Sequence, residues 1–121
     1  MSVGLTYQKK AHTFAKYGDI TYPFLSLGEE AGEVLGKIAK AVRKSGGSTP
    51  TEILTAVSEP TTEEEITLRN GIIKELGDLQ WQLAACCTEL KITLEDIQNV
   101  NIAKLEGRNL RGTIIGAGDE R

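Results

Sequence analysis

The segment LGEEAGEV, residues 27–34, places three glutamates among apolar and small residues. Around it, apolar residues recur with the 3.6-residue period of an amphipathic helix, which we expect to begin near Pro23 and to reach about Lys44. Glu30 and Glu33 lie on one flank of the apolar stripe, and Glu29 lies further round. The residues of the stripe are Phe24, Leu27, Ala31, Val34, Leu35, Ile38 and Val42.

A second predicted helix also carries two acids beside an apolar stripe, in ELGD, residues 75–78. Thr62 and Glu65 form a capping-box pattern that predicts its start, and the helix should run to about Leu90. Glu75 and Asp78 flank its apolar stripe with the same spacing of three. The stripe steps by three and four, as in a packed bundle, and consists of Ile72, Leu76, Leu79, Leu83, Cys86 and Leu90.

Four carboxylates converge if these two helices face each other, namely those of Glu30, Glu33, Glu75 and Asp78. Close carboxylates raise one another's pKa, and a hard divalent cation such as Mg²⁺ would relieve the repulsion. The alternative is a solvated acidic face with salt bridges, for instance between Glu33 and Lys37. The spacing alone leaves both interpretations open.

A last helix is predicted over about residues 93–108. Its core-facing stripe opens with apolar side chains but continues with Asn101, Lys104 and Arg108. Because burying an unpaired charge is costly, these groups need anionic partners inside the bundle. The partners could be the carboxylates or the phosphates of a ligand.

The remaining segments complete an all-α prediction. A first helix is expected over about residues 4–17, and a glycine-rich tail over 109–121. Residues 45–61 form a long connection, which could hold a short helix. No segment has the period of a strand, so the pattern predicts an all-α fold, most simply a four-helix bundle. We expect residues 1–121 to form one domain.

Charge, hydropathy and cysteine content indicate which partners and which compartment suit the chain. The net charge of −3 does not favour a nucleic acid polymer or an anionic membrane. No apolar run approaches the roughly 20 residues of a membrane span, and the first residues do not resemble a signal peptide. Cys86 and Cys87 are adjacent and read as buried thiols in a reducing compartment, which favours a cytoplasmic protein.

Two further residues are candidate binding residues. His12, the only histidine, could contact a base or a phosphate, although a lone helical histidine is more often structural. Trp81 lies opposite the main stripe of its helix among small residues, which suit close packing of a second helix. We interpret this face first as an oligomer interface and second as a base-stacking site. The small residues around Trp81 are Gly77, Ala84, Ala85 and Thr88.

EEAGE followed by ELGD resembles the EExxE…ExxD signature of the MazG-like all-α nucleotide pyrophosphohydrolases. NIAKLEGR and RGTIIGAGDER are similar to the last helix and tail of small single-domain members. The resemblance implies a helical bundle that forms homodimers or homotetramers. It also implies hydrolysis of nucleoside triphosphates between the α and β phosphates, with Mg²⁺, or Mn²⁺ as a substitute, giving a nucleoside monophosphate and pyrophosphate.

The same resemblance implies roles for individual residues. Glu30, Glu33, Glu75 and Asp78 match metal ligands, and Glu29 matches an acid that orients or deprotonates water or binds a further metal. The residues that match phosphate or sugar contacts are Asn101, Lys104 and Arg108.

One departure from the family pattern is the long stretch between Glu33 and Glu75, which we interpret as an insertion that forms a lid or an oligomer contact. The alternatives to the enzyme are a non-catalytic nucleotide-binding or helical interaction module and a pyrophosphatase that acts on another nucleotide phosphoanhydride.

Overall fold

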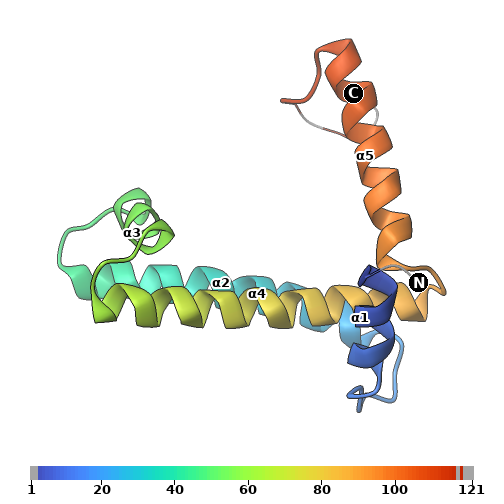
Figure 1. Ribbon diagram of the computed structural model, residues 1–121, viewed down its shortest axis with the longest axis horizontal. Coiled ribbons are helices and arrows are strands. Elements are labelled where there is room, and N and C mark those ends of the chain that lie inside the picture. Colours follow the sequence, from blue (N-terminus) through green and yellow to red (C-terminus); the bar gives the residue numbers. More distant parts are fainter. Residues whose placement is uncertain (1–2, 117, 119–121) are drawn as a thin grey trace.

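The computed structural model describes residues 3–116 and residue 118, and these form α-helices without any strand (Figure 1). The all-α prediction is therefore confirmed. Within these residues the number of helices is five rather than four, because part of the expected connection is itself helical. The helices are α1 (Val3–His12), α2 (Tyr22–Ser45), α3 (Pro50–Ser58), α4 (Glu63–Glu89) and α5 (Leu94–Arg111).

Capping residues set several of the helix boundaries. Thr49, Thr62 and Thr93 begin α3, α4 and α5, and the side chain of each accepts a hydrogen bond from the main chain three residues later in a full capping box. Gly46 and Gly112 end α2 and α5 in the left-handed conformation, with φ of 74° and 70°, which a residue without a β-carbon adopts readily.

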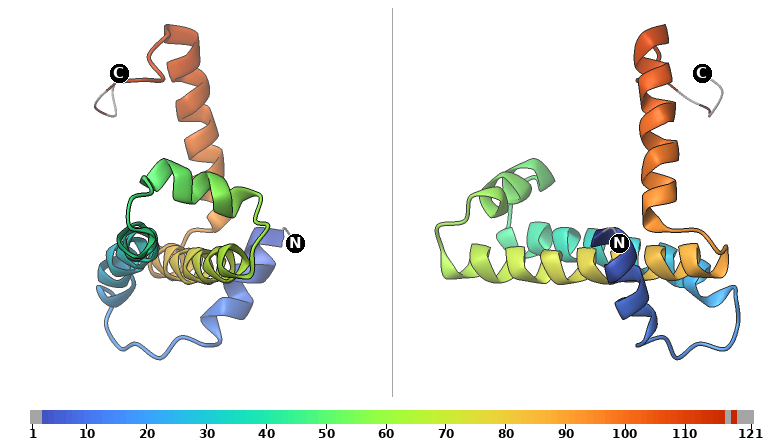
Figure 2. Two further views of the ribbon diagram at one scale, coloured as in Figure 1. Left: turned by 90° about the vertical axis from the view of Figure 1, so that its left-hand side faces the viewer. Right: turned by 45° about the vertical axis from the view of Figure 1, so that its right-hand side comes forward.

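α2 and α4 form the long axis of the molecule, running antiparallel and side by side (Figures 1 and 2). α3 lies across one end of this pair and packs on both helices (Figure 2). The guanidinium of Arg69 on α4 donates hydrogen bonds to the carbonyls of Val57 and Ser58, at 2.8 and 3.1 Å. These bonds satisfy carbonyls at the C-terminal end of α3 and fix the helix on the pair.

The buried core lies at the other end, where α1 crosses α4 near the start of α5. Gln8, which is 6% exposed, joins the three helices. Its amide nitrogen donates to the Thr88 hydroxyl and to the carbonyl of Ile92, and its amide oxygen accepts from the N–H of Leu94. The core around it consists of Ala84, Cys87 and Leu94, against which Tyr7, Leu83, Ile92 and Ile97 pack.

α1 ends at His12 rather than at the expected residue 17. The residues after His12 form turns, and Tyr17 contacts residues of α4 and α2. Its hydroxyl donates to a carboxylate oxygen of Glu89 over 2.7 Å, and its ring stacks on Tyr22 with 5.6 Å between centroids. These contacts tie the link between α1 and α2 to the end of α4.

α5 projects away from the α2–α4 pair, so a four-helix bundle does not form within one chain (Figures 1 and 2). The link from α4 turns sharply at Lys91, whose φ of 58° is unusual for a residue with a side chain. Within the described residues, α5 contacts α1 and α4 but not α2. None of the described helices is both long enough and apolar enough to span a membrane.

Candidate active site

Three of the four predicted carboxylates meet across the α2–α4 pair. Glu30 comes from α2, while Glu75 and Asp78 come from adjacent turns of α4. Each offers one carboxylate oxygen, and these oxygens lie within 4.8 Å of one another. Glu33, one turn further along α2, is not part of this group and is exposed.

The acidic group carries an excess of negative charge. Burial raises the pKa of the Glu30 carboxyl, and the charges of Asp78, Glu75, Glu29 and Glu33 raise it further. A cation held between the carboxylates would remove this repulsion. The donor set is entirely oxygen and partly open to solvent, which fits a hard divalent ion that keeps water in its shell.

A lysine also reaches the acidic group. The ammonium of Lys37 on α2 lies 3.5 Å from a carboxylate oxygen of Glu75 on α4. Its stem crosses α4 over Gly71, where a β-carbon would lie 3.4 Å from Cδ of Lys37. Lys37 is the site residue that our sequence reasoning missed, because we considered it only as a salt-bridge partner for Glu33.

The polar residues of α5 lie apart from the acids of the same chain, because α5 does not contact α2. Asn101 is exposed and Lys104 is partly buried. Arg108 is only 7% exposed, and its guanidinium donates a hydrogen bond to the carbonyl of Gly118 over 3.2 Å. The expected cleft, with acids on one wall and α5 cations on the other, therefore does not form within one chain.

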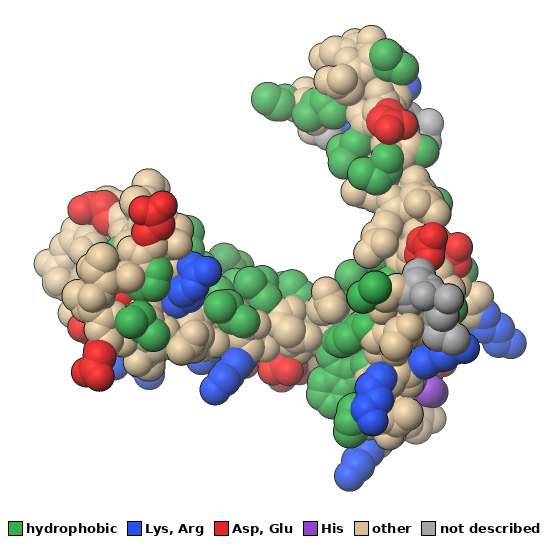
Figure 3. All heavy atoms as spheres, viewed as in Figure 1, with side chains coloured by type: hydrophobic (Ala, Val, Ile, Leu, Met, Phe, Trp, Pro, Cys, Tyr) green, Lys and Arg blue, Asp and Glu red, His purple; other side chains and the backbone are tan. Residues whose placement is uncertain are grey.

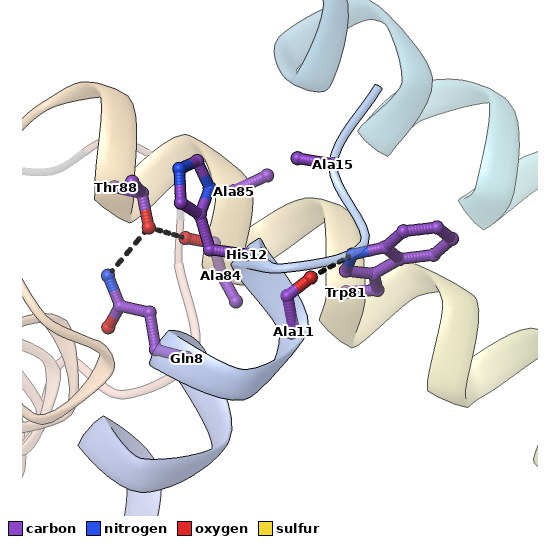
Figure 4. A pocket seen from close by; sticks show the side chains of 8 residues that line it. All are labelled: Gln8, Ala11, His12, Ala15, Trp81, Ala84, Ala85 and Thr88. Atoms are coloured by element: carbon purple, nitrogen blue, oxygen red, sulfur yellow. Dashed lines mark hydrogen bonds between the residues drawn. The ribbon is translucent and has the colours of Figure 1, made fainter. Parts of the chain in front are cut away.

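His12 and Trp81 border a small pocket between α1 and α4 (Figure 4). Its volume of about 10 Å³ suits at most one water molecule and excludes a nucleobase. A second helix does pack on the small residues beside Trp81, as we expected, but it is α1 of the same chain. The other residues that line this pocket are Gln8, Ala11, Ala15, Ala84, Ala85 and Thr88.

Comparison with known proteins finds the same family that the acidic motifs resemble. The family model described as "MazG nucleotide pyrophosphohydrolase domain" matches residues 23–111, which include α2 to α5. The chain is 31% identical over 102 residues to the "Gene 37 protein" of Mycobacterium phage L5, an alignment that covers 84% of this chain and 76% of the phage protein. No solved structure matches the chain significantly.

Proposed function

The chain belongs to the MazG nucleotide pyrophosphohydrolase family, and from this premise we propose that it is a Mg²⁺-dependent nucleoside triphosphate pyrophosphohydrolase. The reaction would convert a nucleoside triphosphate and water into the monophosphate and pyrophosphate. The observation that carries the proposal is the convergence of Glu30, Glu75 and Asp78 at the interface of α2 and α4. These residues belong to the two acidic motifs, and they come together although α3 lies between the motifs in the sequence.

Glu30, Glu75 and Asp78 would bind the divalent ion, with Glu33 one turn along α2 as a further ligand. When bound, such an ion polarises a phosphoryl group and lowers the pKa of a bound water. Mn²⁺ prefers similar oxygen ligands and is a reasonable substitute. Glu29 is exposed beside this group and would accept the proton of the attacking water or orient that water.

We propose that the partner of this chain is a second copy, which binds to its exposed apolar surface. Apolar side chains gather along the α2–α4 pair between the projecting helices α3 and α5 (Figure 3). Apolar side chains gathered on one exposed surface are typical of a protein–protein interface. The large apolar residues exposed on α2, α4 and α5 include Leu35, Ile66, Ile73, Leu76, Val100, Ile102, Leu105 and Leu110.

A homodimer or homotetramer formed through this surface would also give the α5 residues a role. Because α5 does not contact α2 of its own chain, the predicted phosphate contacts of Asn101, Lys104 and Arg108 would be made to the site of another copy. Sedimentation or light scattering at micromolar concentration tests this assembly, and a stable monomer would contradict it.

The activity itself is tested by a turnover screen of canonical and modified nucleoside triphosphates with Mg²⁺, in which the products are identified. Release of a nucleoside monophosphate and pyrophosphate would support the enzyme. Binding of nucleotides without turnover of any of them would favour the alternative, a non-catalytic nucleotide-binding module.

A further inference from the structure

α3 stands over the α2–α4 pair and borders an open cavity of about 1110 Å³. One wall of this cavity is the C-terminal half of α2, which contributes Lys37, Lys40 and Lys44. Steps of three and four place these lysines on one side of the helix. Among the residues that the structure describes, Lys40 and Lys44 form no ion pair, whereas Lys37 pairs with Glu75.

The acidic residues of the opposite wall are partly neutralised by helix N-termini. Glu52 accepts a hydrogen bond from the N–H of Thr49 at 3.1 Å, and Glu65 accepts one from the N–H of Thr62 at 3.2 Å. A carboxylate at this position interacts favourably with its own helix dipole. Glu63 and Glu64 also line the far wall, so an anion in the cavity would lie against α2.

Lys37 links the cavity to the acidic group. Its ammonium lies 3.5 Å from Glu75, one of the three converging carboxylates, and its side chain lines the cavity. Along α2, Lys37 lies two turns beyond Glu30, about 10 Å along the axis. Helical side chains lean toward the N-terminus of their helix, so the lysines of α2 lean toward the acids.

We propose that Lys37 and Lys40 bind the β and γ phosphates of the substrate and hold the leaving pyrophosphate in the cavity beneath α3. This inference rests on the proposed function and adds two lysines of α2 to the phosphate contacts proposed for α5 of another copy. In the reaction, a water oxygen bonds to the α-phosphorus and loses a proton to a carboxylate. The bond from the α-phosphorus to the bridging oxygen breaks, and its electron pair leaves with pyrophosphate.

The ion pair between Lys37 and Glu75 fits this role. Once a cation engages Glu75, the attraction between Glu75 and Lys37 falls, and the ammonium can donate to a phosphate instead. Lys40, one turn further on, would meet the terminal phosphate. Both lysines would stabilise the charge that develops on the leaving group.

Calorimetric titration of pyrophosphate in the presence of Mg²⁺ tests the proposal with the whole chain. Lys37→Met and Lys40→Ala should each weaken pyrophosphate binding about tenfold or more, the loss expected for a charge-assisted hydrogen bond. Arg43→Ala is the matched control, because Arg43 is an exposed cation on α2 that does not line the cavity. Circular dichroism would establish that each variant keeps its helices.

The outcomes separate this inference from the proposed function. If the wild type hydrolyses triphosphates but both lysine variants bind pyrophosphate as tightly as Arg43→Ala does, the inference is wrong and the function stands. If no triphosphate is hydrolysed but pyrophosphate binding depends on Lys37 and Lys40, the anion site stands and the function fails. Absence of pyrophosphate binding to the wild type would overturn the inference directly.

Discussion

The indole N–H of Trp81 donates a hydrogen bond to the main-chain carbonyl of Ala11, 3.3 Å away, and this bond joins α4 to the last turn of α1 (Figure 4). The same carbonyl also accepts a hydrogen bond from the N–H of Phe14 at 3.1 Å, so the indole adds a second bond at the end of α1. The face of α4 that we expected to meet another copy is thus used to hold the N-terminal helix of the same chain.

Trp81→Phe should therefore lower the stability of the chain without changing its assembly. The substitution removes the hydrogen bond and keeps most of the ring, so we expect a loss of about 1 kcal/mol in the free energy of unfolding. Urea denaturation followed by circular dichroism measures the loss, and light scattering measures the mass. A shift to a smaller species would restore the oligomer interpretation of this face.

Gln8 should contribute more to stability than any exposed glutamine. Gln8→Ala leaves the carbonyl of Ile92 and the N–H of Leu94 without their partner in the core, and each buried unsatisfied group costs about 1–3 kcal/mol. We expect a destabilisation of about 3 kcal/mol in urea denaturation. Gln98→Ala on the exposed side of α5 is the control, and equal effects of the two substitutions would contradict the assigned role.

The sequence predicts α2 and α4 and their acids because periodicity fixes which side chains share a helix face. It does not predict the direction of α5, because that direction depends on the left-handed conformation of Lys91 and on the bonds of Gln8. Nothing in the local sequence indicates that a lysine adopts φ of 58°. A four-helix bundle was therefore the wrong expectation for a single chain.

The connection over residues 45–61 was read as able to hold a short helix, and α3 is that helix. Its bounds were not predicted, because its apolar pattern is too short to establish a helical period. A start signal was nevertheless present, since Thr49, Pro50 and Glu52 combine a capping box with a proline in the first turn. The stripe of α2 was also only partly correct, because Phe24 and Leu35 are 42% and 68% exposed in the chain.

Glu75→Gln should remove the divalent site while leaving the helices intact. The substitution keeps the shape of the side chain but removes one of three converging negative charges. Loss of residues that only orient metal ligands costs about 10–100-fold in affinity or activity, so loss of a ligand should cost at least about 100-fold in kcat/KM. Titration with Mn²⁺, followed by the paramagnetic signal of the free ion, measures binding independently of turnover.

The control for this substitution is Glu106→Gln, which removes an exposed carboxylate of α5 outside the acidic group. It should leave Mn²⁺ binding and turnover unchanged. Wild-type binding and turnover in Glu75→Gln would remove Glu75 from the proposed site.

The bond that is cleaved follows from the order of charges along α2. Glu30 precedes Lys37 and Lys40, so a triphosphate whose terminal phosphates meet the lysines has its α-phosphorus nearest the carboxylates. Water held at the carboxylates would then attack the α-phosphorus, and pyrophosphate would leave toward α3. Hydrolysis in ¹⁸O-labelled water, followed by mass spectrometry of both products, should place the label in the nucleoside monophosphate. Label in pyrophosphate would mean attack at the β-phosphorus, while a nucleoside diphosphate with orthophosphate as first products would mean that the substrate lies in another register along α2.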